Sequence, residues 1–137
     1  MSICSSISFG SKSILISNAS KTSPDPHLDE ISPYAKTNVV QLKDGKISEI
    51  IIDPKELNIE ANKFEDLLGD DAQFNANKML DIFKGEDNDF SKAVCLNAAA
   101  GLIVTEKNSE FKNAYESARS HILSGKSFEN LKNIQNV

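Results

Sequence analysis

The sequence predicts an α/β chain with one short strand, one β-hairpin and three to four helices toward the C-terminus. Three observations predict this class. A short β-favouring run, SILI, stands early in the chain, two apolar arms flank the turn pair Asp44-Gly45, and the second half carries apolar residues at helical spacing. The 137 residues suit one domain that can bury a core.

The first 26 residues differ in composition from residues 27–137, and we expect them to form a separate leader. Residues 1–24 hold nine serines, no acidic residue, and Lys12 and Lys21 as their only basic residues. A transit peptide can have this composition but is usually rich in arginine, which is absent here. A partly ordered leader is the alternative, and within it we expect a strand at 13–17.

A β-hairpin is predicted at residues 38–53. Its arms are NVVQL and KISEIIID, and Asp44-Gly45 between them is a favoured turn pair because both residues tolerate positive φ. Pro54 ends the second arm because proline cannot donate a hydrogen bond to the sheet.

Three to four helices are predicted after the hairpin, the fourth being short. The first should bury one apolar face and end at Gly85, the second should be central because it is apolar nearly all round, and Gly125 should close the third. Within the second helix, Cys95 should be a small buried hydrophobe, and Asn97 should bond to a neighbouring loop or helix end. The expected starts are Asp71, Asp89, Ser109 and Ser127, and the apolar face of the first comprises Ala72, Ala76, Met79, Leu80 and Phe83.

Charge and composition exclude several classes of partner. The net charge is −5 and Arg119 is the only arginine, which argues against a nucleic-acid groove. Two cysteines, Cys4 and Cys95, do not suggest a disulfide framework, and they fit the reducing cytoplasm. No apolar run approaches the roughly 18 residues that cross a bilayer, so no membrane association is expected.

Two adjacent carboxylates, Asp29 and Glu30, stand in a loop just before the hairpin and are the candidate metal ligands. Such a pair can hold Mg²⁺ for a phosphorylated substrate, because this cation prefers oxygen ligands. His27 could add a ligand for a softer metal, although a lone histidine is more often solvated. Simple solvation of the acidic pair is the alternative. No nucleophile–base pair is evident, and His121 is expected to be exposed or at a packing edge.

The wide spacing of the glycines argues against a phosphate-binding loop within this chain. A backbone that wraps around pyrophosphate usually needs clustered glycines, and no two of the six glycines here are close together.

Four separated stretches resemble segments of anthranilate phosphoribosyltransferases, which have a glycosyltransferase family 3 domain. They keep the family's order and spacing and cover about Leu28 to Leu131. The four stretches are LDEISPYAKTNVVQLKDGKI, GDDAQFNANKMLDIFKGE, KAVCLNAAAGLIV and SARSHILSGKSFENL.

The resemblance implies that residues 27–137 are the C-terminal part of a phosphoribosyltransferase α/β domain. Such enzymes transfer phosphoribosyl from phosphoribosyl pyrophosphate to anthranilate in tryptophan biosynthesis. The family's Asp-Glu loop binds Mg²⁺, and its positions correspond here to Asp29 and Glu30. Catalytic side chains remain unassigned.

The chain also departs from the family pattern. Family members are more than twice as long and carry an N-terminal helical domain and a glycine-rich pyrophosphate loop, neither of which is found here. The segment SNASKTSPDPH replaces the family's His-Gly and Asp-Gly pieces. We therefore expect a truncated chain that is inactive in isolation. The alternatives are a non-catalytic remnant, half of a split protein that docks on a complementary N-terminal chain, and an unrelated small metal-binding module.

Overall fold

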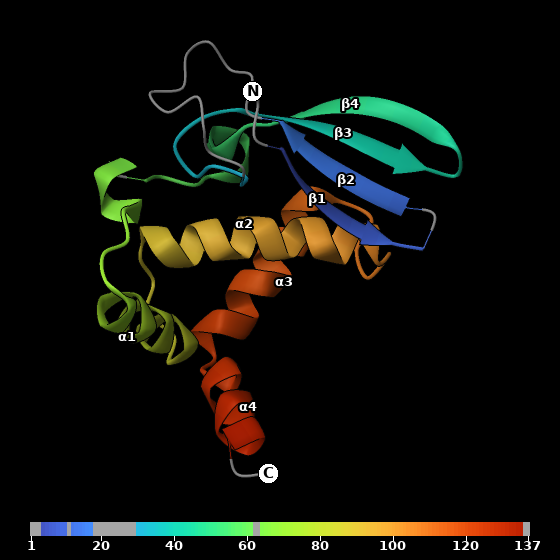
Figure 1. Cartoon of the computed structure of the whole chain (residues 1–137). Helices are drawn as coiled ribbons and strands as arrows, with labels where there is room; N and C mark the ends of the chain where they lie inside the picture. The colour runs from blue at the N-terminus through green and yellow to red at the C-terminus, as the bar shows by residue number, and fades with distance from the viewer. Residues whose placement is uncertain (1–3, 11, 18–29, 62–63, 136–137) are drawn as a thin grey trace.

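The computed structural model describes residues 4–10, 12–17, 30–61 and 64–135. Within these ranges, four antiparallel strands form one sheet in the order β1-β2-β3-β4, and two short 3-10 helices and four α-helices follow (Figure 1). The strands are β1 (Cys4–Phe9), β2 (Lys12–Ser17), β3 (Thr37–Lys43) and β4 (Lys46–Ile52). The helices are η1 (Pro54–Leu57), η2 (Phe64–Leu67), α1 (Ala72–Phe83), α2 (Asp89–Val104), α3 (Phe111–Leu123) and α4 (Lys126–Gln135).

The predicted α/β class and hairpin are confirmed, and the described residues form four α-helices where three to four were predicted. The hairpin is β3–β4, in which Lys43 pairs with Lys46. Asp44 and Gly45 between them have φ of 51° and 74°, as a two-residue turn with the twist of the strands requires. The strand expected at 13–17 lies within β2.

The sequence did not lead us to expect β1. Its residues, CSSISF, include three serines, which favour turns over strands. Pairing with β2 places Phe9 opposite Lys12, and Gly10 in the turn has φ of 62°. Tertiary pairing thus overrides a weak local preference. The expected division at residue 26 falls outside the described residues and stays a prediction.

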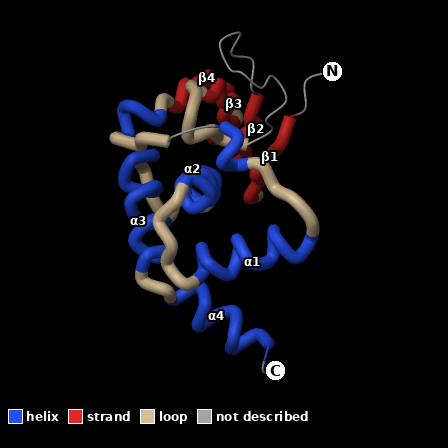
Figure 2. The backbone as a smooth tube through the Cα atoms, turned by 90° about the vertical axis from the view of Figure 1, so that its left-hand side faces the viewer, coloured by secondary structure: helices blue, strands red, loops and turns tan. Residues whose placement is uncertain are grey.

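One face of the sheet packs against the helices. Side chains alternate between the two faces of a strand, and Thr37 and Val39 on β3 share the buried face with Ile52 on β4. The helices formed by the described residues all lie on this side of the sheet, and α2 lies between the sheet and α1 (Figures 1 and 2).

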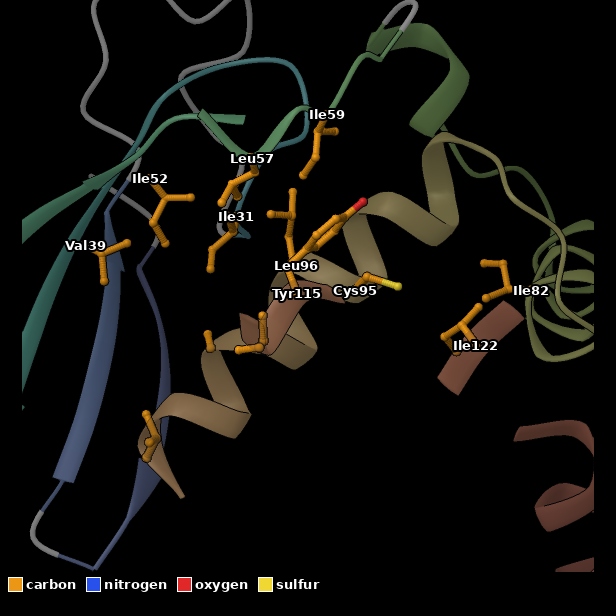
Figure 3. Packing of buried hydrophobic residues seen from close by; sticks show 14 residues of the cluster. Ile31, Val39, Ile52, Leu57, Ile59, Ile82, Cys95, Leu96, Tyr115 and Ile122 are labelled. Atoms are coloured by element: carbon orange, nitrogen blue, oxygen red, sulfur yellow. The ribbon is translucent and has the colours of Figure 1, made fainter. Parts of the chain in front are cut away.

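The core is built around α2, as predicted (Figure 3). Leu96, Ala99 and Ala100 of this helix are completely buried, and Tyr115 of α3 packs in the same cluster. Cys95 is also buried, which raises the pKa of its thiol to about 11 and keeps it protonated near neutral pH. The prediction that Cys95 is a small buried hydrophobe is confirmed.

Two details of the predicted helices were wrong. The expected apolar face of α1 is largely exposed: Ile82 is the only buried residue of this helix, and Met79 is 56% exposed. The reason is that α1 lies at the margin of the fold, where only its last turn meets the core. The cap of α3 is Glu110 rather than Ser109, and its side chain makes no capping hydrogen bond.

Candidate functional site

The candidate site is the loop that leads into β3. Glu30 opens the described part of this loop and is exposed. Asp29 and His27 lie outside the described residues, so the acidic pair stays a prediction as a metal site. His121 is exposed on α3, as expected. Across the described ranges, no group of three or more His, Cys, Asp or Glu side chains could hold a metal ion.

Asn97 of α2 binds the backbone just after the acidic pair. Its Oδ1 accepts a hydrogen bond from the N–H of Ile31 at 3.0 Å, and its Nδ2 donates to the carbonyl of Ile31 at 3.3 Å and to that of Ala93 at 2.9 Å. The side chain of Ile31 is fully buried in the core. The loop is therefore fixed to α2 by polar and apolar contacts at one residue. The predicted role of Asn97 is confirmed.

The next residues of the loop form a compact turn. The N–H of Ser32 donates to Thr37 Oγ1 at 3.1 Å, and the N–H of Tyr34 donates to Ser32 Oγ at 3.1 Å. Ser32 and Thr37 are almost completely buried, and these bonds satisfy polar groups that would otherwise be costly to bury. The turn joins the loop to the start of β3.

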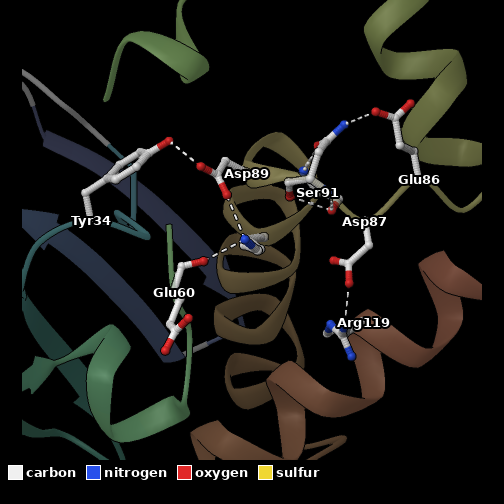
Figure 4. A network of polar contacts seen from close by, with 9 residues as sticks. Tyr34, Glu60, Glu86, Asp87, Asp89, Ser91 and Arg119 are labelled. Carbon is white, nitrogen blue, oxygen red and sulfur yellow. Dashed lines mark hydrogen bonds and ion pairs between the residues drawn. The ribbon is translucent and has the colours of Figure 1, made fainter. Parts of the chain in front are cut away.

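A charged network ties the far end of the loop to the start of α2 (Figure 4). The Tyr34 hydroxyl donates to Asp89 Oδ2 at 3.1 Å, and Lys92 Nζ lies 2.7 Å from Asp89 Oδ1. Lys92 Nζ also donates to the carbonyl of Glu60 at 2.6 Å. Asp89 is only 6% exposed, so its charge is compensated by direct partners rather than by bulk water.

Two further contacts fix the start of α2. Asn88 and Ser91 form a reciprocal capping box, with N–H to side-chain oxygen distances of 2.9 Å in both directions. Arg119 of α3 pairs with Asp87 in the preceding loop (Figure 4). The helix that carries Asn97 is thus held at its N-terminus as well as along its length.

An open pocket of about 820 Å³ lies beside the Tyr34 turn, with Lys36, Asp53 and Lys55 among its lining residues. Lys36 Nζ is 3.0 Å from Asp53 Oδ2. The hydrogen bond from Lys36, together with the backbone N–H of Lys55, lowers the pKa of Asp53, while Asp53 raises the pKa of Lys36. The pocket walls therefore carry paired charges rather than a field of one sign.

The network of Tyr34, Asp89 and Lys92 was missed from the sequence. The spacing of Asp89 and Lys92 allows a pair across one helical turn, but such pairs are common on exposed helices. The contact with Tyr34, 55 residues away, and the burial of Asp89 distinguish this pair from an ordinary surface pair.

Comparison with known families identifies the fold. The model of the family described as "Glycosyl transferase family, a/b domain" matches residues 22–128, more than half of the chain. The chain belongs to this family. The resemblance read from the four sequence stretches is thereby confirmed.

Within the glycosyl transferase family, the curated relatives include anthranilate phosphoribosyltransferases. That of Pelagibacter ubique is 80% identical over 110 residues, which cover 80% of this chain and 33% of the relative. That of a Thermoanaerobacter species is 37% identical over 107 residues, which cover 78% of this chain and 32% of the relative. The chain thus spans about a third of the length of these relatives.

A solved structure of the glycosyl transferase family shows the same arrangement. The anthranilate phosphoribosyltransferase of Thermus thermophilus superposes with a TM-score of 0.71 at 25% identity, covering 80% of this chain and 32% of that protein. The predicted C-terminal part of a phosphoribosyltransferase α/β domain is therefore confirmed as the fold class. Among the described residues, no helix is long and apolar enough to cross a membrane.

Proposed function

We propose that the chain is the C-terminal part of an anthranilate phosphoribosyltransferase. The whole enzyme transfers phosphoribosyl from phosphoribosyl pyrophosphate to anthranilate in tryptophan biosynthesis. The observation that carries this proposal is the 80% identity to the Pelagibacter relative over 110 residues. The buried free thiol of Cys95 is compatible with a reducing compartment, and we place the protein in the cytoplasm.

The residue types of the loop that contains Asp29 and Glu30 are suited to Mg²⁺. Glu30 is an exposed carboxylate, the type of hard oxygen ligand that Mg²⁺ prefers, and this cation usually needs few protein ligands because it keeps several waters. We propose that Asp29 and Glu30 supply the protein's carboxylate oxygens. A bound Mg²⁺ would neutralise negative charge on the departing pyrophosphate.

We propose that the side chains packed around this loop hold it in place and do not take part in bond making. The loop after Glu30 is fixed by Asn97, Thr37 and Tyr34, which make structural hydrogen bonds. Phosphoribosyl transfer in this proposal depends on electrostatic stabilisation of the leaving group, and we assign no general base.

A second proposal concerns the 137 residues by themselves. The sequence has no cluster of glycines that could wrap around pyrophosphate. We propose that the isolated chain does not turn over substrate and acts only when joined to a complementary N-terminal chain that carries the phosphate-binding loop. A non-catalytic remnant would not act even then.

The proposed function is tested with a chimera. The matching third of the Pelagibacter enzyme is replaced by residues of this chain, and consumption of anthranilate is followed by its fluorescence. We expect turnover of the same order as that of the parent enzyme. The control chimera carries Asp29→Asn and Glu30→Gln and should lose at least about a hundredfold in rate, the scale of losing a charge-stabilising contact. A folded chimera without turnover would contradict the proposal.

A further inference from the structure

The β1–β2 hairpin lies outside the part of the chain that matches the family. The match covers residues 22–128, which we call the family part, whereas β2 ends at Ser17. Among the described residues of the family part, β3 and β4 are the only strands. The sheet is therefore built from two strands of the family part and two strands that precede it.

One edge of β3 is covered by β2. Residues 13–17 of β2 pair antiparallel with residues 38–42 of β3, and the other side of β3 pairs with β4. Without β2, the backbone N–H and C=O groups on that side of β3 would form an open edge, which favours pairing with another strand. The family part thus has a strand-binding edge, and this chain fills it with its own residues.

The same hairpin covers part of α2. Both β1 and β2 lie against this helix (Figure 1), and Ile7 of β1 packs against the buried apolar cluster. The residues of α2 in that cluster include Ala99, Ala100 and Val104. An apolar helix surface needs a cover, because exposing it to water costs free energy in proportion to its area. The edge of β3 and the surface of α2 are therefore covered together.

An ion pair adds a third contact between the hairpin and the family part. Lys12 Nζ, at the start of β2, lies 2.6 Å from Glu106 Oε2, and Lys43 Nζ of β3 lies 3.7 Å from Glu106 Oε1. Glu106 is about half exposed, and ion pairs at the surface contribute little stability. The hairpin is therefore held chiefly by its pairing with β3 and by Ile7, two kinds of contact that another strand can also make.

We propose that the edge of β3 and the adjoining surface of α2 are a docking surface for a strand of the complementary N-terminal chain, and that the β1–β2 hairpin occupies this surface until it is displaced. The inference rests on the proposed function, because it takes that chain as its partner. This chain spans about a third of the length of its curated relatives, so most of their length lies outside the match and is available to supply such a strand. An added strand binds through main-chain hydrogen bonds and through apolar side chains on one face.

The hairpin acts as a competitor for this surface. It belongs to the same chain, so it is present at a high effective concentration. A partner that binds only the open form loses affinity in proportion to the fraction of molecules that are open. Loosening the hairpin should therefore strengthen docking, whereas a hairpin that took no part in docking would have no such effect.

The test uses two variants of the full 137-residue chain. Ile7→Asp places a charge against the buried cluster and should release the hairpin. Phe9→Asp adds the same charge to the same strand at a side chain that is 63% exposed, and it should leave the hairpin in place. Hydrogen exchange followed by NMR reports the release. The β3 amides that face β2 should exchange faster in Ile7→Asp, whereas those that face β4 should keep their protection.

Docking is then measured with the part of the Pelagibacter relative that lies outside the match, labelled with a fluorophore and followed by anisotropy. We expect Ile7→Asp to bind this partner at least about tenfold more tightly than the wild type, and Phe9→Asp to bind it like the wild type. If exchange shows a released hairpin but the affinity is unchanged, the docking surface is overturned while the complementary chain stands. If none of the three proteins binds the partner, both proposals fail.

A second variant covers the case in which Ile7→Asp unfolds or leaves the exchange of β3 unchanged. Leu15→Pro interrupts β2, which pairs with strands on both sides, so it breaks the hairpin from within. Its exchange and affinity are interpreted in the same way. If both variants lose the whole fold, or if neither loosens β3, the hairpin is not a displaceable cover and the inference is overturned.

Discussion

Asp53 shows how one residue can serve two structural contacts at the end of the hairpin. Its Oδ1 accepts the N–H of Lys55 at 3.0 Å and so caps η1, while its Oδ2 pairs with Lys36 at 3.0 Å. Both contacts favour the ionised carboxylate, and the pKa of Asp53 is lowered accordingly. The ion pair also joins the loop between Glu30 and β3 to Asp53, the residue directly after β4.

This lowered pKa predicts a pH dependence of stability. A carboxyl whose pKa is lower in the folded state stabilises the fold above its unfolded pKa of about 4. That contribution is lost as pH falls below this value toward the folded pKa. The urea midpoint should therefore fall between pH 5 and 3 more steeply for the wild type than for Asp53→Asn. Parallel curves for the two proteins would show that Asp53 does not contribute.

The sequence predicted some residues of the site and missed others for a physical reason. Asn97 could be predicted to need a partner because a polar amide interrupts an apolar helix. Its partner Ile31, 66 residues away, could not be predicted, because nothing local marks which backbone will lie opposite. The contact between Tyr34 and Asp89 could not be predicted for the same reason. Asp29 stays a prediction.

At the scale of elements, α2 organises the molecule. It contributes the buried Leu96, Ala99 and Ala100 to the core and supplies Asn97 and Asp89 to the loop. Its apolar composition predicted its central place, because a helix without a polar face is stable only when surrounded. The loop near Glu30 therefore depends on the packing of this helix.

The stability of the core should depend on Leu96 far more than on its exposed neighbour. Leu96→Ala removes a completely buried side chain and should lower the free energy of unfolding by about 2–5 kcal/mol. Val94→Ala, at a position that is 41% exposed on the same helix, should cost less than about 1 kcal/mol. Urea unfolding followed by circular dichroism measures both. Equal losses would mean that α2 is not buried as described.

At the scale of the whole molecule, all the helices among the described residues lie on one side of the sheet. The odd-numbered side chains of β4 point away from the helices, and among them Ile47 and Ile51 are 74% and 61% exposed. β4 is also an edge strand of the sheet. An exposed apolar edge strand is prone to pair with other chains. We therefore expect copies of the isolated chain to associate with one another through this face of the sheet.

Replacing these isoleucines should reduce association of the purified chain. The double variant Ile47→Thr with Ile51→Thr keeps β-branched residues in the strand and removes apolar surface. We expect a larger monomer fraction by sedimentation velocity across a range of protein concentrations. Ile134→Thr is the control, because Ile134 is 72% exposed but lies on α4. If both variants associate like the wild type, the face of β4 is not responsible.

The sequence by itself determined the α/β class, the hairpin, the four helices and the family, because these depend on local turn chemistry, on hydrophobic periodicity and on motifs that survive in order. Only the tertiary structure decided that CSSISF is a strand, that α1 is mostly exposed, and that Asn97 binds the peptide after Glu30. These features depend on contacts between residues far apart in the chain. Their free energy is set by which surfaces meet, and no local pattern encodes that.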